Sequence, residues 1–240
     1  MFALLIHIYY HDSWEKIFRG QLKNLQRYSP VIMINLCTTK PGNSQIISCI
    51  KADFPQAFVI VTPNKGRDIG GKLALVDFFI KTGQQSEYIV FLHDKKSPHS
   101  ITGERWRLKL FSIIDTQKVE TIIKEFKNNP RIGIIGARDF IKNEYDKKHK
   151  KFETTNSGKI TELIAKYDLK LTDYTFIAGT MFWIRRAIIQ KFFSVHSALE
   201  CREMLEEGNF TDQYEGTYTH SWERILCWLA NDQHSIIKGI

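Results

Sequence analysis

A polar turn rich in glycines and cations lies between the strand-like run 58–62 and the apolar-periodic stretch 72–81. In α/β folds the carboxyl ends of strands and the amino ends of helices converge at such turns, which makes them frequent ligand sites. The glycines allow a ligand to approach closely, and the cations can neutralise phosphate. The turn therefore predicts a site for a sugar nucleotide or another phosphorylated ligand, formed by Asn64, Lys65, Gly66, Arg67 and Asp68.

This turn does not match the known phosphate-binding fingerprints. It has neither the GxGxxG spacing of dinucleotide-binding folds nor the P-loop consensus, so neither fold follows from it. A plain strand-to-helix connection, in which Asp68 only caps the following helix, remains an alternative.

A second charged segment follows the short apolar strand predicted at 87–92. Two strands thus deliver charged side chains at their carboxyl ends, as the crevice rule for open α/β sheets expects of a ligand site. Carboxylate and imidazole groups suit Mn or Mg when substrate oxygens complete the shell, whereas lysines can neutralise phosphate without a metal. The candidates are His93, Asp94, Lys95 and Lys96. A packed histidine beside solvated lysines is the alternative.

The last third of the chain contains a predicted helix with a buried stripe of Trp222, Ile225, Leu226 and Leu229. His220 and Glu223 lie three residues apart and therefore share one neighbouring face. They are candidates for a base or a metal ligand in the crevice, and an exposed surface pair is the alternative.

Strand and helix periodicities alternate along the chain, which predicts an α/β fold with a mostly parallel sheet flanked by helices. Strands are expected at 3–9, 31–37, 58–61, 88–92, 132–135 and 176–184, with helical stretches between them. No Pro/Ser-rich linker interrupts the pattern, so we expect a single domain over 1–240. The segment 142–159 has almost no aliphatic residues and is predicted to be a long mobile loop. It serves either as a flap facing an acceptor or a membrane, or as a solvated insertion.

The net charge of +8 at pH 7 implies acidic partners, which include nucleotide donors, nucleic acid and the anionic face of a membrane. A nucleic-acid-binding module would explain the basic run 142–151. However, the basic residues do not interleave with aromatic residues in a recognisable module, so no nucleic acid is expected. A catalytically silent α/β subunit that positions a partner enzyme is a third interpretation.

The cysteine pattern and the hydropathy of the chain indicate the cellular compartment in which the protein is expected. The four cysteines form no CxxC pair, which indicates neither a zinc site nor a disulfide framework. The apolar run 1–10 is too short for a signal peptide or a membrane span. We therefore expect a cytoplasmic protein, with peripheral contact at the inner face of a membrane as one option.

Four segments together resemble the rhamnan synthesis F family, glycosyltransferases of bacterial cell-surface polysaccharide assembly. They are 64–70 (NKGRDIG), 91–99 (FLHDKKSPH) with Trp106 following, 178–185 (AGTMFWIR) and 220–224 (HSWER). The segments lie in the family's order and span most of the chain. The resemblance implies that the single expected domain has a GT-A-like (Rossmann-like) fold, in which the end of the first strand holds the nucleotide. Tyr9 and Tyr10 are the candidates for stacking on its base.

The resemblance also implies an activity, namely transfer of a sugar such as rhamnose from a nucleotide-diphosphate donor to a glycan or lipid-linked acceptor, with inversion. Such a reaction needs a base for the acceptor hydroxyl and a group that stabilises the departing diphosphate. We expect Glu223 or Asp68 to be the base. The diphosphate is assigned to Lys65, Arg67, Lys95 and Lys96. Asp94 and His220 are the expected ligands of a Mn or Mg ion, and a metal-independent mechanism is the alternative.

Overall fold

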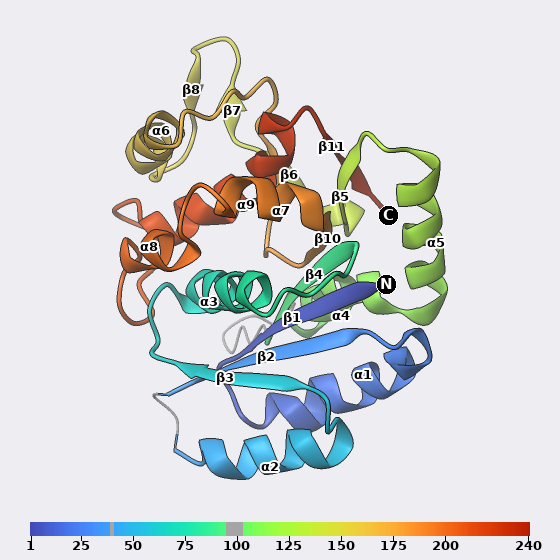
Figure 1. Cartoon of the computed structure of the whole chain (residues 1–240). Helices are drawn as coiled ribbons and strands as arrows, with labels where there is room; N and C mark the ends of the chain where they lie inside the picture. The colour runs from blue at the N-terminus through green and yellow to red at the C-terminus, as the bar shows by residue number, and fades with distance from the viewer. Residues whose placement is uncertain (39–40, 95–102) are drawn as a thin grey trace.

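The computed structural model describes residues 1–38, 41–94 and 103–240 of the chain (Figure 1). Its centre is a seven-stranded sheet in the order β11-β5-β10-β4-β1-β2-β3. Every neighbouring pair in this sheet is parallel except the two that β10 makes with β4 and β5. The predicted α/β fold with a mostly parallel sheet is therefore confirmed. The strands of this sheet are β1 (Phe2–Ile8), β2 (Val31–Cys37), β3 (Phe58–Thr62), β4 (Tyr88–His93), β5 (Ile132–Gly136), β10 (Phe182–Arg185) and β11 (Ile236–Gly239).

The strand order creates a crevice between β1 and β4. The chain builds outward from β1 to β2 and β3 and then crosses back to place β4 on the other side of β1. In open α/β sheets, ligands bind at the carboxyl ends of strands where the order reverses in this way. β1 and β4 pair in register up to His7 and His93, so both strands end at the same level.

Helices cover both faces of the sheet, with α3, α7 and α9 on one face and α1, α2, α4 and α5 on the other (Figure 1). No helix in the described ranges is both long enough and apolar enough to cross a membrane. The α-helices are α1 (Arg19–Leu25), α2 (Asn43–Asp53), α3 (Arg67–Lys81), α4 (Gly103–Phe111), α5 (Thr116–Asn128), α6 (Ser157–Lys166), α7 (Arg186–Phe193), α8 (Ala198–Glu203) and α9 (Tyr218–Asp232). A π-helical turn spans Trp14–Phe18, and 3-10 turns span Gln26–Tyr28, Ser112–Ile114 and Arg138–Phe140.

The core lies between the sheet and these helices. β1 and β4 are buried along their whole length, which is the pattern of parallel strands covered on both faces. The predicted stripe of α9 is buried as well. A Cβ atom at Gly71 of α3 would come within 2.2 Å of His7 Nδ1 on β1. The absence of a side chain at this position lets the start of α3 pack against the ends of β1 and β4.

The segment 142–159 differs from its prediction as a long loop. It contains the last residues of β6 (Ile141–Asn143), the strands β7 (Tyr145–Asp146) and β8 (Lys151–Phe152), and the start of α6. β6 pairs with β9 (Thr175–Ile177), and β7 pairs with β8. The rings of Tyr145 and Phe152 pack on Tyr174, and Phe152 also stacks on Trp228. Aromatic contacts with distant residues thus take the place of the missing aliphatic side chains.

The predicted strand 176–184 is divided in two. β9 ends at Ile177 and β10 begins at Phe182, and between them Gly179 has φ 85° and Thr180 has φ 47°. Residues in the left-handed region cannot continue a strand, so the chain turns here. The turn places residues 179 and 180 beside the crevice at the carboxyl end of β4.

Candidate functional site

A polar cleft lies at the carboxyl end of β4, between the start of α3, the β9–β10 turn and the first turns of α9. It encloses about 350 Å³ of space between atoms, including its open mouth. Five of the residues singled out in the sequence meet here, although they lie up to 156 positions apart. The lining residues are Arg67, Asp68, Ile69, His93, Gly179, Thr180, Thr219, His220 and Glu223.

Asp68 and the buried Lys72 form an ion pair in the floor of the cleft. Lys72 is fully buried, and its Nζ atom lies 2.7 Å from Asp68 Oδ2 and 3.1 Å from His93 Nδ1. Thr180 donates a hydrogen bond of 2.8 Å to the same carboxylate oxygen and also accepts one from Lys72. Burial raises the pKa of Asp68, but His93, Lys72 and these hydrogen bonds outweigh it and hold the pKa well below its usual range. Asp68 is therefore ionised at neutral pH.

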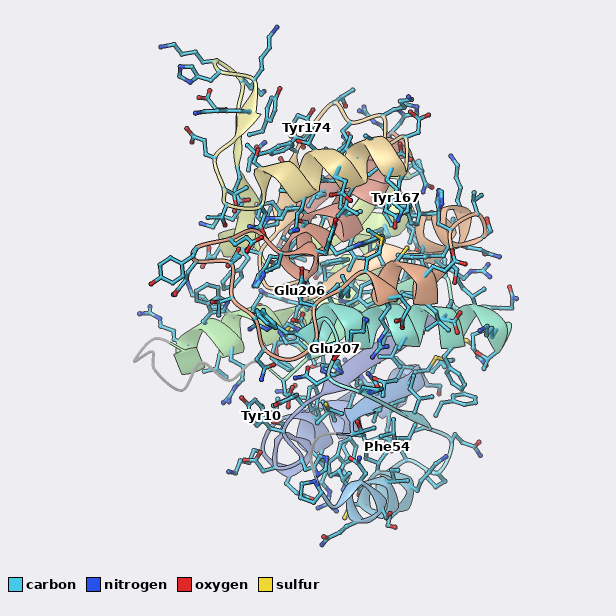
Figure 2. The ribbon with its side chains drawn as sticks, turned by 90° about the vertical axis from the view of Figure 1, so that its left-hand side faces the viewer. Tyr10, Phe54, Tyr167, Tyr174, Glu206 and Glu207 are labelled. Carbon is cyan, nitrogen blue, oxygen red and sulfur yellow. The ribbon has the colours of Figure 1, made fainter. Side chains whose placement is uncertain are left out.

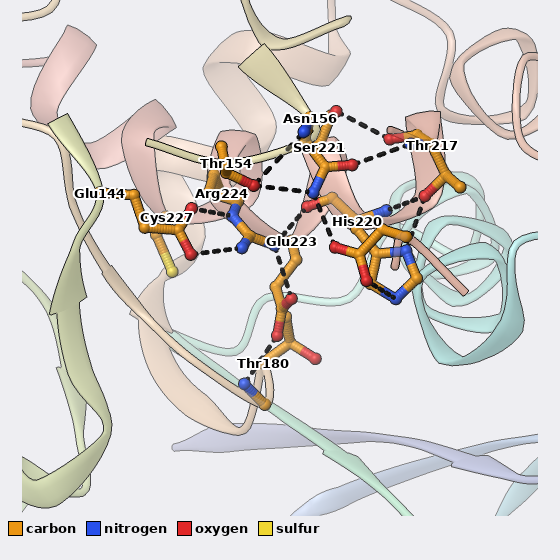
Figure 3. Close-up of polar contacts among 12 residues, drawn as sticks. Glu144, Thr154, Asn156, Thr180, Thr217, His220, Ser221, Glu223, Arg224 and Cys227 are labelled. Carbon is orange, nitrogen blue, oxygen red and sulfur yellow. Dashed lines mark hydrogen bonds and ion pairs between the residues drawn. The ribbon is translucent and has the colours of Figure 1, made fainter. Parts of the chain in front are cut away.

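Glu223 is the second carboxylate of the cleft, and it is held from two sides (Figure 3). Its Oε1 atom accepts the backbone N–H of Gly179 at 2.7 Å, and its Oε2 atom accepts Arg224 Nη1 at 2.9 Å. Arg224 also forms a two-pronged ion pair with Glu144, at 3.0 and 2.7 Å. The segment that the sequence predicted as a loop thus supplies Glu144, which fixes the arginine that orients Glu223.

His220 and Arg67 meet at the rim of the same cleft. His220 Nε2 lies 3.1 Å from Arg67 Nη1, and His220 Nδ1 lies 2.6 Å from Thr217 Oγ1. Burial lowers the pKa of His220; Asp212 opposes this effect and Arg67 reinforces it. A neutral ring that accepts from Arg67 and donates to Thr217 fits this arrangement. The guanidinium next to Nε2 disfavours a metal cation at this atom.

Two cleft residues have a backbone conformation that non-glycine residues seldom adopt. Arg67 has φ 51° and Thr180 has φ 47°. A left-handed non-glycine residue costs on the order of 1–3 kcal/mol and tends to occur at functional sites. In this protein both residues line one cleft.

The remainder of the predicted turn, residues 64–66, is covered by the segment after α8. Gly66 N–H donates to Glu206 O at 2.7 Å, and Gly208 N–H donates to Asn64 O at 2.8 Å. Figure 2 shows Glu206 and Glu207 on this segment where it passes alongside α3. Lys65 pairs with Glu203 at 3.2 Å. Asn64, Lys65 and Gly66 therefore hold two parts of the chain together and do not line the cleft.

Asp94 closes the crevice between β1 and β4. Its carboxylate accepts the backbone N–H of Tyr9 at 2.9 and 3.0 Å and that of Tyr10 at 2.6 Å. Burial raises its pKa to about 7, against the effect of these hydrogen bonds. The predicted role of Tyr9 and Tyr10 in base stacking is untested. Their rings lie edge to face with centroids 4.8 Å apart, and Asn209 donates to the Tyr9 hydroxyl at 3.3 Å.

The predicted metal ligands Asp94 and His220 do not form a common Mn or Mg site. The described ranges contain no group of three or more His, Cys, Asp or Glu side chains that could hold a metal ion. Asp94 is engaged by backbone amides and does not line the cleft, whereas His220 does. The predicted pair of metal ligands is thus not brought together. Lys95 and Lys96 lie outside the described residues.

Sequence reasoning missed Lys72 and Thr180, which hold Asp68. The signal for Lys72 was available, because it is a cation at the start of the apolar-periodic stretch, four residues after an aspartate. Thr180 gave no local signal, because its partner lies 112 positions away. Glu144 and Arg224 were missed for the same reason.

The cleft combines one permanently ionised carboxylate, a second carboxylate held by an arginine and an amide, and a cation at the rim. A carboxylate with a very low pKa is a poor base but a good partner for developing positive charge. The other carboxylate is in a position to accept a proton, and Arg67 can pair with an anionic group. This set suits displacement at a carbon that becomes positively charged as an anionic group departs.

The chain was compared with sequence models of known families and with curated proteins. The sequence model of rhamnan synthesis protein F matches residues 1–235. Two similar proteins, both named uncharacterized protein WxcX, occur in two strains of Xanthomonas campestris pv. campestris. Each is 24% identical over 227 residues, which cover 93% of this chain and 30% of the relative. The chain thus spans about a third of the length of these relatives. Because the match extends over nearly all of its residues, the chain belongs to the rhamnan synthesis protein F family.

Proposed function

We propose that the chain is a glycosyltransferase domain that moves a sugar from a nucleotide-diphosphate donor to a glycan or lipid-linked acceptor. Family membership associates the chain with polysaccharide synthesis. The observation that carries the proposal is the pairing of two differently held carboxylates, Asp68 and Glu223, in one cleft with a cation at its rim. The cleft lies at the carboxyl end of β4, beside the switch point of the sheet, where a GT-A-like, Rossmann-like domain would bind its nucleotide.

The two carboxylates take different roles in this proposal. Asp68 is ionised and lines the cleft, so it stabilises positive charge on the sugar ring as the donor bond breaks. Glu223 takes the proton of the acceptor hydroxyl, because it is anchored by Gly179 and Arg224 without a buried lysine of its own. Attack from the side opposite the departing diphosphate inverts the anomeric carbon.

The departing diphosphate is neutralised by protein cations. Arg67 is the cation at the rim of the described cleft, and Lys95 and Lys96 remain candidates by their place in the sequence. We propose a metal-independent mechanism, because backbone amides engage Asp94 and the Arg67 guanidinium lies beside His220 Nε2. Rhamnose is the proposed sugar on the strength of the family description.

A basic hairpin provides a contact for an anionic membrane that carries a lipid-linked acceptor. The β7–β8 hairpin projects from the body of the protein (Figure 2), and Lys147, Lys148, Lys150 and Lys151 are exposed. Each lysine near an anionic bilayer surface contributes about 1 kcal/mol of attraction. Replacing the four lysines with glutamine should abolish co-sedimentation with phosphatidylglycerol vesicles, and undiminished co-sedimentation would refute the contact.

The donor site is tested by thermal shift and calorimetry against nucleoside diphosphates and their sugars, because a ligand that binds only the native state raises its stability. Binding should persist in excess chelator. Arg67→Ala should weaken donor binding by roughly tenfold or more and leave the fold intact. Arg131→Ala, an exposed arginine before β5, is the matched control. Equal affinity of the Arg67 variant and the wild type would remove Arg67 from the donor site.

A further inference from the structure

A second cavity lies beside the cleft, between α4 and the chain that leads into β6. Its volume is about 500 Å³. Pockets that hold sugars and other small ligands commonly have volumes of about 300–1,000 Å³. The residues used below are Arg105, Trp106, Lys109, Phe140, Lys142 and Ala178, all of which line it.

Trp106 forms an aromatic wall in this cavity. Its ring stacks on Phe140 with centroids 5.4 Å apart and an angle of 29° between the planes. Phe140 is buried, whereas Trp106 is 41% exposed. The chain has five tryptophans, and the other four, Trp14, Trp183, Trp222 and Trp228, are at most 1% exposed. An indole held against a buried ring while much of its surface faces a cavity is a platform for a flat apolar group.

The charges around this platform are mostly positive. Arg105, Lys109 and Lys142 line the cavity, and of these Lys109 pairs with Asp139. Asp139 is the carboxylate among the described lining residues, so the wall has a net positive charge. A ligand that matches both features has a ring with an apolar face and an anionic substituent.

The second cavity adjoins the proposed catalytic group. Ala178 lines the second cavity, and the next residue, Gly179, lines the cleft and donates its N–H to Glu223 Oε1. A Cβ atom at Gly179 would meet Leu110 of α4 at 3.1 Å, so the helix that carries Trp106 packs directly against this turn. The second cavity therefore borders the same turn that anchors Glu223 in the cleft.

We propose that this cavity is the acceptor subsite and that it binds a saccharide unit that carries a phosphate ester. The apolar face of the sugar ring lies on Trp106, and the phosphate pairs with Arg105 and Lys142. This inference rests on the proposed function, because it is Glu223 that would take the proton of the bound acceptor. The phosphate can come from a lipid-linked acceptor or from a phosphorylated glycan, which share this chemistry.

Fluorine NMR of the chain labelled with 5-fluorotryptophan tests the site directly, since Trp106 differs from the four buried tryptophans. Trp106→Phe assigns its resonance by removing it. The probes are rhamnose 1-phosphate, methyl rhamnoside and inorganic phosphate, each titrated without nucleotide to about 10 mM, which detects millimolar dissociation constants. We expect rhamnose 1-phosphate to shift the Trp106 resonance, methyl rhamnoside to bind about tenfold more weakly, and inorganic phosphate to cause no shift.

Variants separate the two parts of the proposed site. Arg105→Gln combined with Lys142→Gln should reduce the affinity for rhamnose 1-phosphate to that for methyl rhamnoside. Leu108→Ala, an exposed apolar residue of α4 that does not line the cavity, is the matched control and should bind like wild type. A Trp106 resonance unmoved by both sugars, or moved equally by inorganic phosphate, would overturn the proposal.

A further variant keeps this test distinct from that of the proposed function. Arg67→Ala, which impairs the donor cleft, should leave the Trp106 titration unchanged. If Trp106 does not respond to saccharide while nucleotide-sugar binding to the wild type persists, the acceptor subsite is wrong and the proposed function stands. Saccharide binding in a protein that binds no nucleotide sugar would instead contradict the proposed function.

To distinguish a lipid source from a glycan source, the Trp106 resonance is titrated with a short-chain isoprenyl phosphate and, separately, with rhamnose 1-phosphate. Equal binding of both would show that the cations bind the phosphate without a contribution from the sugar, which would contradict the stacking role of Trp106. Preference for the sugar phosphate supports the proposal.

Discussion

The ion pair between Asp68 and Lys72 offsets the free-energy cost of burying the lysine. Burying an ammonium without a partner is expensive, and an ion pair repays this only when the geometry is good and other hydrogen bonds satisfy the remaining groups. Here the carboxylate receives Lys72 and Thr180, and the lysine also contacts His93. The pair therefore holds an ionised carboxylate in place at the floor of the cleft, with its charge balanced by the buried Lys72.

A double-mutant cycle on this pair gives the first prediction. Lys72→Met should lower the free energy of unfolding by roughly 3–5 kcal/mol, because it leaves Asp68 unpaired against a low-dielectric wall. Asp68→Asn combined with Lys72→Met should cost less than the sum of the two single changes. The control is Lys81→Met on the same helix, where the pair with Asp77 has the same spacing and Lys81 is 65% exposed. Urea unfolding measures all four variants, and additive effects at Asp68 and Lys72 would contradict the account.

The start of α3 is shaped by glycines whose roles are steric. A Cβ atom at Gly70 would lie 1.7 Å from the carbonyl oxygen of Lys65, and one at Gly66 would lie 2.2 Å from Leu205. Gly66 also has φ 72°. These glycines let the turn fold under the segment after α8, and this explains the glycine content that the sequence suggested was for ligand approach.

Gly70→Ala is the second prediction. Because the new methyl group would collide with backbone, the turn must shift, and we expect a loss of at least about 2 kcal/mol in the free energy of unfolding. Gly158→Ala in α6 is the matched control, since its Cβ would meet nothing within 4 Å. Alanine is favoured over glycine there by up to about 1 kcal/mol. Thermal unfolding of both variants measures the contrast, and a neutral effect at Gly70 would show that the turn relaxes easily.

Most elements were predictable because their signals are local. The strands β2 and β5 have the boundaries that periodicity indicates, to within a residue. The failures depend on distant contacts. The β7–β8 hairpin is held by Tyr174 and Trp228, and the break before β10 depends on the conformation of Gly179 and Thr180. Neither the hairpin contacts nor the backbone conformation of the turn can be predicted from the local sequence.

At the scale of the whole molecule, the part of the site that could be predicted from the sequence is the part formed by converging strand ends. Arg67, Asp68 and His93 follow or end their strands and reach one cleft, as the crevice rule requires. Helical spacing put His220 and Glu223 on one face, but only the family resemblance favoured the cleft over solvent. Asn64, Lys65 and Asp94 have the right residue types, yet backbone and side-chain partners elsewhere in the chain engage them.

Asp94 joins the two halves of the sheet at the switch point, and its titration gives the third prediction. Burial raises its pKa to about 7 in the folded protein, compared with about 3.9 in an unfolded chain. Between these values the native state binds more protons than the unfolded state, so the contribution of Asp94 to stability falls as the pH rises from about 4 to about 7. Asp94→Asn removes this titration.

The stability difference between Asp94→Asn and wild type should therefore shift in favour of the variant as the pH rises. The slope is on the order of 1.4 kcal/mol per pH unit within this window. Urea unfolding of both proteins at pH 5, 6 and 7 measures this slope. A difference that is independent of pH would show that Asp94 is ionised throughout and that its hydrogen bonds to Tyr9 and Tyr10 outweigh its burial.

The central claim is that Glu223 acts as the base for sugar transfer in the cleft, and Glu223→Gln tests it most directly. Glutamine keeps the size of the side chain and can still accept the N–H of Gly179, but it cannot take a proton. With the donor identified by thermal shift, the account predicts that turnover falls by a factor on the order of 10²–10⁴. Donor affinity measured by calorimetry should stay within about threefold of wild type. Turnover equal to that of wild type in a folded variant would contradict the claim.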